Sequence, residues 1–219
     1  MRIMPSKNTI KTYVEKSYYH IYNRGINKER IFLDAQDYKT FLSYLKLYLS
    51  PVSLQVSLQG DSSQVKAAPS KQLKNYTDQI KLNAYCLLSN HFHLLVWQDD
   101  FDRINFFMRS LATKFSRYFN RKYHRLGPVF QSVYKAVLVE SEDQLLYLSK
   151  YIHRNPLDVL PARRLLAGYK YSSYPNYLGL FNQTWVEPLD FINRSYKTFV
   201  EETDERDLLT IKSVLIEEI

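Results

Sequence analysis

Two histidines in an apolar run are the residues of this sequence whose type and spacing most directly suggest chemistry. His91 and His93 stand within the run 84–97. If this run is a β-strand, its period of two places both imidazoles on one face, about 7 Å apart, while Phe92 and Leu94 face the core. Two imidazoles on one rigid face can share a metal ion, so the pair is a candidate metal site.

Two ligands do not complete a metal site, and a later helix offers further candidates. Ser141 begins a Ser-x-x-Gln capping box, and Pro156 disfavours helix at the residue before it, so a helix is predicted between them. Tyr151 and Asn155 are four residues apart and point the same way on that helix. If the helix crosses the strand, the Asn155 oxygen can be the third ligand and Tyr151 a nucleophile. Neutral imidazole and amide ligands suit Mg²⁺ or Mn²⁺, and the chemistry implied is cleavage of a phosphodiester.

Other residues leave some roles open. Tyr147 shares the face of Tyr151, and Tyr151 is preferred because Asn155 lies one turn beyond it. His153 lies about 200° around the helix from Tyr151, so a structural role is predicted for it. His20 stands in a β-prone run and can reach the metal site from a neighbouring strand, but a structural or DNA-contacting role is favoured.

The charge of the chain is unevenly distributed. Its 219 residues carry a formal net charge of +8, with a pI near 9.3. Residues 201–219 hold seven acidic and two basic residues, a net charge of −5, which leaves +13 on residues 1–200. A basic body with 19 Tyr and 12 Phe favours a nucleic acid partner, whose phosphates meet cations and whose bases stack on rings. The residues predicted to bind DNA are Arg24, Arg103, Arg109, Lys114, Arg117, Arg121, Lys122 and Arg125.

The single cysteine and the hydropathy pattern indicate a compartment. Cys86 has no second cysteine with which to form an internal disulfide, which is usual in a reducing cytoplasm. No apolar segment reaches about 18 residues, and the first ten residues do not resemble a signal peptide. A cytoplasmic protein without a membrane partner is therefore predicted.

The predicted elements form a ferredoxin-like α+β fold, an antiparallel sheet with helices on one face, plus a C-terminal extension. The strands are expected at 18–22, 82–88, 92–97 and 129–140, and the helices at 34–49, about 104–119 and 141–155. The predicted domains are residues 1–160, with an inserted loop at about 50–79, and the extension 161–219, whose acidic end either folds over the basic body or stays solvated.

Four motifs in this order resemble the single-tyrosine HUH transposases, and within them the REP-associated tyrosine transposases. The resemblance covers roughly residues 14 to 180. It departs from the family in the long insertion before the His-x-His motif and in the acidic tail. The motifs are Asn90-His91-Phe92-His93-Leu94-Leu95, Arg125-Leu126-Gly127-Pro128-Val129-Phe130-Gln131, Tyr151-Ile152-His153-Arg154-Asn155-Pro156 and Tyr171-Ser172-Ser173-Tyr174.

The resemblance implies a metal-dependent single-strand DNA endonuclease and strand transferase that acts on hairpin DNA. By motif position, His91, His93 and Asn155 would bind Mg²⁺ or Mn²⁺. Tyr151 would attack the scissile phosphate and keep the 5′-phosphate as a phosphotyrosine. Insertion-sequence relatives act as dimers, whereas the REP-associated branch implies a monomer in which Tyr151 acts in cis.

Three other functions fit parts of the pattern. A ferredoxin-like sheet rich in aromatic residues can bind single-stranded nucleic acid without cleaving it. A replication-initiator-type HUH nickase shares the same chemistry but normally has more domains. A zinc hydrolase is disfavoured because no third histidine or acid stands close to His93 in the sequence.

Overall fold

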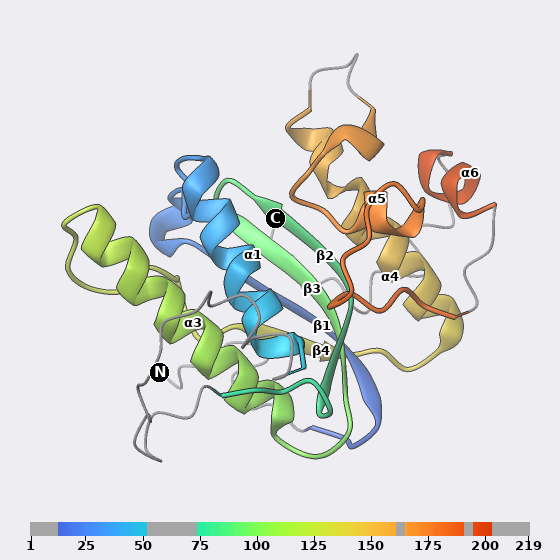
Figure 1. The fold of residues 1–219 in the computed structure, drawn as a ribbon, viewed down its shortest axis with the longest axis horizontal. Helices are drawn as coiled ribbons and strands as arrows, with labels where there is room; N and C mark the ends of the chain where they lie inside the picture. The colour runs from blue at the N-terminus through green and yellow to red at the C-terminus, as the bar shows by residue number, and fades with distance from the viewer. Residues whose placement is uncertain (1–12, 52–73, 161–164, 191–194, 203–219) are drawn as a thin grey trace, which may run out of the picture.

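Four antiparallel strands form the central sheet of this computed structural model, in the order β2-β3-β1-β4 (Figure 1). Helix α1 (Ala35–Leu49) joins β1 to β2, and α3 (Arg103–Lys122) joins β3 to β4. This βαββαβ order confirms the predicted ferredoxin-like α+β class. The strands are β1 (Ser17–Arg24), β2 (Ile80–Leu88), β3 (His91–Gln98) and β4 (Lys135–Leu138).

The structure describes residues 13–51, 74–160, 165–190 and 195–202. The expectations for the start of the chain, for most of the inserted loop and for most of the acidic tail lie outside these residues, and the two-domain division stays a prediction. The described range contains no helix that is both long and apolar enough to cross a lipid bilayer. The shorter helices are η1 (Ile26–Lys28), η3 (Asn155–Asp158), η4 (Leu166–Gly168), α5 (Tyr174–Tyr177) and α6 (Tyr196–Glu201).

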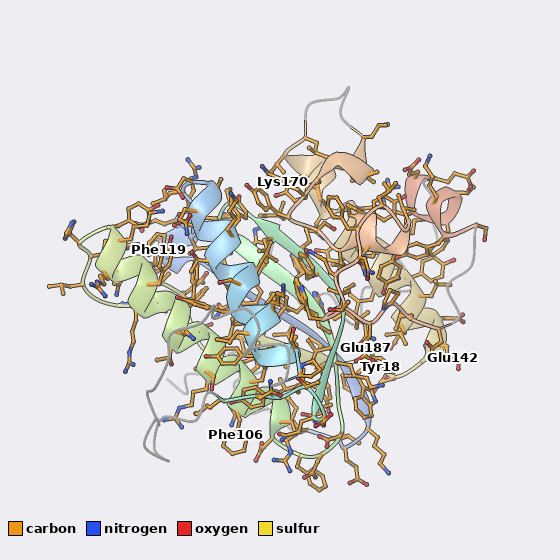
Figure 2. All side chains as sticks on the ribbon, viewed as in Figure 1. Tyr18, Phe106, Phe119, Glu142, Lys170 and Glu187 are labelled. Carbon is orange, nitrogen blue, oxygen red and sulfur yellow. The ribbon has the colours of Figure 1, made fainter. Side chains whose placement is uncertain are left out.

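Each face of the sheet carries its own helical layer, whereas helices were predicted from the sequence on one face only. Phe41 of α1 and Phe115 of α3 pack with Phe92 of β3 in the larger core. Helix α4 (Glu142–Arg154) covers the opposite face, where its Leu148 packs with Leu95. Figure 1 shows α1 and α3 on one side of the strands and α4 on the other, and the side chains that fill both layers are drawn in Figure 2. Helix α4, predicted from the sequence at 141–155, therefore lies on the face to which His91 and His93 of β3 point.

A β-bulge in β2 decides which of its residues reach the second layer. Leu82 pairs with Val96 and Ala84 with Leu95, so Asn83 is an extra residue on this strand. Because alternation has a period of two, the extra residue moves Ala84 to the face opposite Leu82. Leu82 packs in the larger core and Ala84 in the core beneath α4.

The fourth strand is shorter than the predicted range 129–140. Phe130 bridges Gly25, while Lys135 pairs with Tyr22, so this segment has two more residues than the part of β1 that it faces. The surplus residues bend away from the sheet, and Val133 is 70% exposed. Apolar alternation therefore extended the prediction past the residues that pair.

The start of α1 is fixed by a buried carboxylate. Asp37 is completely buried and accepts hydrogen bonds from Leu33 N, from the Tyr118 and Tyr123 hydroxyls and from Lys122 Nζ, at 2.7–2.9 Å. Burial alone would raise the pKa of Asp37, but the hydrogen bonds, led by that of Lys122, outweigh it and hold the pKa below its usual value. These contacts tie the N-terminus of α1 to the C-terminus of α3.

The Asp37→Asn variant is expected to lower the free energy of unfolding by about 2 to 4 kcal/mol at pH 7, because it removes a buried charge that pairs with Lys122. Since the folded-state pKa is depressed, this contribution is complete above the unfolded-state pKa of about 4 and is lost as the pH falls through the folded-state value. Urea unfolding should therefore show the two proteins converging toward pH 3. The control is Asp34→Asn, whose side chain is 52% exposed and should matter less; equal losses in both variants would contradict this account.

Candidate active site

His93 lies at the centre of the site and presents an unpaired nitrogen. It is 2% exposed, and its Nδ1 is 2.9 Å from Nε2 of His20, which is also buried. Within the described part of the chain, its Nε2 is buried without a hydrogen-bond partner. Because buried polar atoms nearly always have a partner, an orphan ring nitrogen here has the character of a metal ligand. When Nδ1–H donates to His20, Nε2 keeps the lone pair that a metal needs.

The surroundings keep His93 neutral. Burial is the largest effect that lowers its pKa well below the usual value, and the nearby His20, His91 and Arg24 lower it further. A neutral imidazole at pH 7 offers its lone pair without first losing a proton.

His91 completes the pair on β3. It is half-buried, and its ring centroid lies 5.1 Å from that of His93 at an interplanar angle of 85°. Its Nδ1 is 2.6 Å from Oδ1 of Asn90, and Nδ2 of Asn90 donates to Lys28 O at 3.2 Å. With Nδ1–H directed at Asn90, Nε2 of His91 also carries the lone pair. Each histidine is thus oriented through Nδ1 by a neighbouring side chain.

Helix α4 brings Tyr151 against His93 and His20. The ring centroid of Tyr151 is 5.5 Å from that of His93 and 6.2 Å from that of His20, both in edge-to-face geometry. Tyr147 lies one turn earlier and packs instead against Phe199, with centroids 5.3 Å apart. The two tyrosines of α4 therefore have different surroundings, although the sequence placed them on one face.

Asn155 lies one turn beyond Tyr151. It is 8% exposed, ends α4 as the C-cap residue, and donates from Nδ2 to Tyr151 O at 2.9 Å. This bond leaves Oδ1 as the side-chain atom with ligand chemistry. Within the described ranges, no three His, Cys, Asp or Glu side chains gather as metal ligands. A metal ion held by His91 and His93 would need an oxygen donor such as the Asn155 amide or a substrate oxygen, and such a mixed set suits Mg²⁺ or Mn²⁺.

Strand β1 contributes Arg24, which was predicted from the sequence to bind DNA, and Tyr22, for which no role was predicted. Tyr22 pairs with His93 and Arg24 with His91, so their side chains share the face of the histidines. Lys135 Nζ lies 5.6 Å from the ring centroid of Tyr22. The signal was present in the alternation of β1, where His20, Tyr22 and Arg24 are two residues apart, but the pairing of β1 with β3 cannot be read from local sequence.

Three of the predicted DNA-binding cations are engaged by acidic side chains. Arg103 pairs with Asp99 and Asp100, Lys122 with Asp34 and Asp37, and Arg125 with Glu29, and the closest N–O distances of these three residues are 2.7 to 3.2 Å. Their charge is locally compensated, so they are weaker phosphate contacts than the sequence suggested.

The other predicted cations of α3 line a groove between α1 and α3. The groove has a volume of about 950 Å³. Lys114 Nζ lies 4.8 Å from the ring centroid of Tyr44 and 5.5 Å from that of Tyr48, and burial lowers its pKa. Because α1 and α3 cover the face opposite α4 (Figure 1), the side chains that line this groove and Tyr151 belong to opposite faces of the sheet. The lining comprises Tyr44, Tyr48, Lys74, Arg109, Ser110, Thr113, Lys114, Arg117, Tyr118, Arg121 and Lys122.

Comparison with known proteins supports the resemblance drawn from the motifs. Residues 54–155 match the family described as "Transposase IS200 like". The fold is similar to that of a REP-associated tyrosine transposase bound to a REP hairpin, with 14% identity, a TM-score of 0.50, and coverage of 87% of this chain and 96% of that one. A transposase candidate from Deinococcus radiodurans R1 gives 16% identity, a TM-score of 0.38, and coverage of 68% and 97%. No curated protein matches the chain.

Proposed function

Residues 54–155 match the IS200-like transposase family, and we propose that this chain is a transposase that cleaves and rejoins single-stranded DNA through Tyr151. The observation that carries the proposal is that His93, whose buried Nε2 has no hydrogen-bond partner among the described residues, packs against Tyr151, with the two ring centroids 5.5 Å apart. Metal-assisted transfer of a phosphodiester to a side chain requires a nucleophile next to a metal ligand, and Tyr151 and His93 have this arrangement.

The proposed reaction exchanges one phosphate ester for another. The phenolic oxygen of Tyr151 bonds to phosphorus and loses its proton, while the bond from phosphorus to the 3′ oxygen breaks. The 3′ oxygen takes up a proton, and the 5′-phosphate stays on the tyrosine. Since the number of ester bonds is unchanged, the freed 3′-hydroxyl of another strand can reverse the step, which is strand transfer.

The residues of the site have distinct tasks in this reaction. His91, His93 and Asn155 would hold Mg²⁺ or Mn²⁺, which when bound polarises the scissile phosphate and offsets its charge. His20 fixes the ring of His93, and the packing of Tyr151 against His93 holds the phenol near the phosphate. Arg24, on the same face, adds positive charge where the phosphate would lie.

The basic groove between α1 and α3 is the proposed contact for the rest of the DNA. In this groove Arg109, Arg117 and Arg121 stand with aromatic residues, and cations with aromatic rings suit a nucleic acid backbone and its exposed bases. A relative in fold is bound to a REP hairpin, and a hairpin is the substrate we propose here. Because the side chains of the groove and Tyr151 belong to opposite faces of the sheet, a DNA that contacts both must pass around the edge of the sheet.

The double variant Arg109→Gln/Arg117→Gln is expected to weaken DNA binding and to reduce the slope of log K against log salt concentration by about one per lost phosphate contact. Fluorescence anisotropy of a labelled hairpin between 50 and 200 mM NaCl measures both quantities. Arg103→Gln is the matched control, because Asp99 and Asp100 already compensate its charge. A loss of slope in the Arg103 variant equal to that in the double variant would refute the assignment of the groove.

An adduct assay tests the enzymatic proposal against the alternative of a binder that does not cleave. A labelled single strand is incubated with the protein and Mn²⁺ and is then separated under denaturing conditions. The proposal expects label on the protein, and none when EDTA is present. Tight binding without any covalent label would indicate a non-cleaving nucleic-acid-binding protein.

A further inference from the structure

Helix α6 is fastened to the side of α4 that faces away from the sheet. Tyr196 is 3% exposed, donates from its hydroxyl to Ser149 Oγ at 2.9 Å, and lies 2.7 Å from Nδ1 of His153. His153 Nε2 is in turn 2.8 Å from Ser173 Oγ, in the segment that pairs with β2. Burial lowers the pKa of His153 to about 3, so the ring is neutral and uses one nitrogen as donor and the other as acceptor.

Two further contacts lie on the same side of α4. Arg154 Nη1 donates to the Val200 carbonyl at 2.6 Å and to the Glu202 carbonyl at 3.2 Å, which satisfies carbonyl groups at the C-terminus of α6. The Phe199 ring lies 4.5 Å from Lys150 Nζ and covers Tyr147. Charge-assisted hydrogen bonds to carbonyl groups are among the stronger contacts that a short helix can make.

The other side of α4 packs on the smaller of the two cores that border the sheet. Leucine side chains together with Ala84 and Cys86 lie beneath α4, whereas the larger core between the sheet and α1 and α3 is rich in aromatic rings. Buried apolar area is the main source of stabilisation, so a helix on the smaller core gains less from packing. The contacts with α6 supply a second attachment, outside the segment that the family model matches.

We propose that α6 is a latch that holds the tyrosine helix on its own sheet, so that Tyr151 acts in cis, and that Tyr196 and Arg154 are its positioning residues. The inference rests on the proposed function of Tyr151. A displacement of the nucleophile by about 1 Å can cost about a hundredfold in rate, which is why the position of α4 matters to the chemistry. The latch also keeps Phe199 against Tyr147, so the tyrosine nearer the start of α4 stays engaged away from His93.

The test is the double variant Tyr196→Phe/Arg154→Gln, with Tyr196→Phe alone as the milder form that keeps the ring. At saturating hairpin DNA and Mn²⁺, the rate of adduct formation is expected to fall roughly 10- to 100-fold, while the dissociation constants of DNA and Mn²⁺ stay unchanged. Amide hydrogen exchange should quicken in residues 142–155 and not in β1 or β3. Lys197→Ala is the matched control, because this residue of α6 has a side chain that is 61% exposed and pairs with Glu201 rather than with α4.

The cis assignment is tested by mixing two inactive chains. A mixture of His91→Ala and Tyr151→Phe chains should form no adduct, because the latch keeps each tyrosine helix on its own sheet. Adducts in the mixture, or wild-type rates and wild-type exchange in folded latch variants, would overturn the latch and leave the proposed function standing. A wild-type chain that forms no adduct would remove the proposed function, and the role of the latch with it.

Discussion

The Tyr151→Phe variant is expected to lose covalent attachment to DNA, by roughly 10³-fold or more, since the substitution removes the oxygen that bonds to phosphorus in the proposed reaction. Phenylalanine keeps the edge-to-face contact with His93, where the ring centroids lie 5.5 Å apart, so the fold and DNA binding should remain. Gel separation of protein–DNA adducts under denaturing conditions, with Mn²⁺ present, measures the loss.

The matched control is Tyr147→Phe, which removes a hydroxyl from the same helix one turn earlier. Its ring packs on Phe199 and not on a histidine, so adducts should form at nearly the wild-type rate. If the Tyr147 variant lost adduct formation and the Tyr151 variant kept it, the nucleophile would be assigned to the wrong tyrosine.

The His93→Ala variant is expected to weaken Mn²⁺ binding by at least about 100-fold, because it removes the proposed ligand, whose buried Nε2 has no partner among the described residues. Calorimetric titration with Mn²⁺ measures this without any DNA. The variant should also lose about 1 to 3 kcal/mol of unfolding free energy, since the buried hydrogen bond between Nε2 of His20 and Nδ1 of His93 is lost.

Two other substitutions test whether the loss of Mn²⁺ binding comes from removing a metal ligand or from removing any histidine. His20→Gln should weaken Mn²⁺ binding by about 10- to 100-fold, because His20 orients the ligand without being one. His124→Ala removes an exposed imidazole at the end of α3 and should leave the affinity unchanged. Wild-type affinity in the His93 variant would contradict the proposed metal site.

The parts of the fold that local pattern controls were predictable. The alternation of β3 correctly directed Phe92 and Leu94 toward the larger core, and the capping residue Ser141 correctly marked the start of α4, where its hydroxyl accepts from Gln144 N. The ferredoxin-like class followed from the order of these elements. Such signals depend on neighbours within a few residues, so a single sequence contains them.

Features that depend on distant residues were not predictable. The extra residue at Asn83 flips the alternation of β2, and the pairing of Arg125 with Glu29 joins positions 96 residues apart. The contact between His20 and His93 requires the register of β1 on β3, and the hydrogen bond of Tyr196 to His153 requires the packing of α6. These interactions determine which basic side chains are left without an acidic partner and can contact DNA, and how the candidate metal ligand His93 is oriented.

The most direct test of the central claim is mass spectrometry of the protein after incubation with a single-stranded hairpin substrate and Mn²⁺, followed by nuclease and protease digestion. The account predicts one peptide that carries a 5′-linked nucleotide on Tyr151 and is absent when EDTA is added. A nucleotide on Tyr147, or the absence of any linked peptide although the DNA binds, would contradict it.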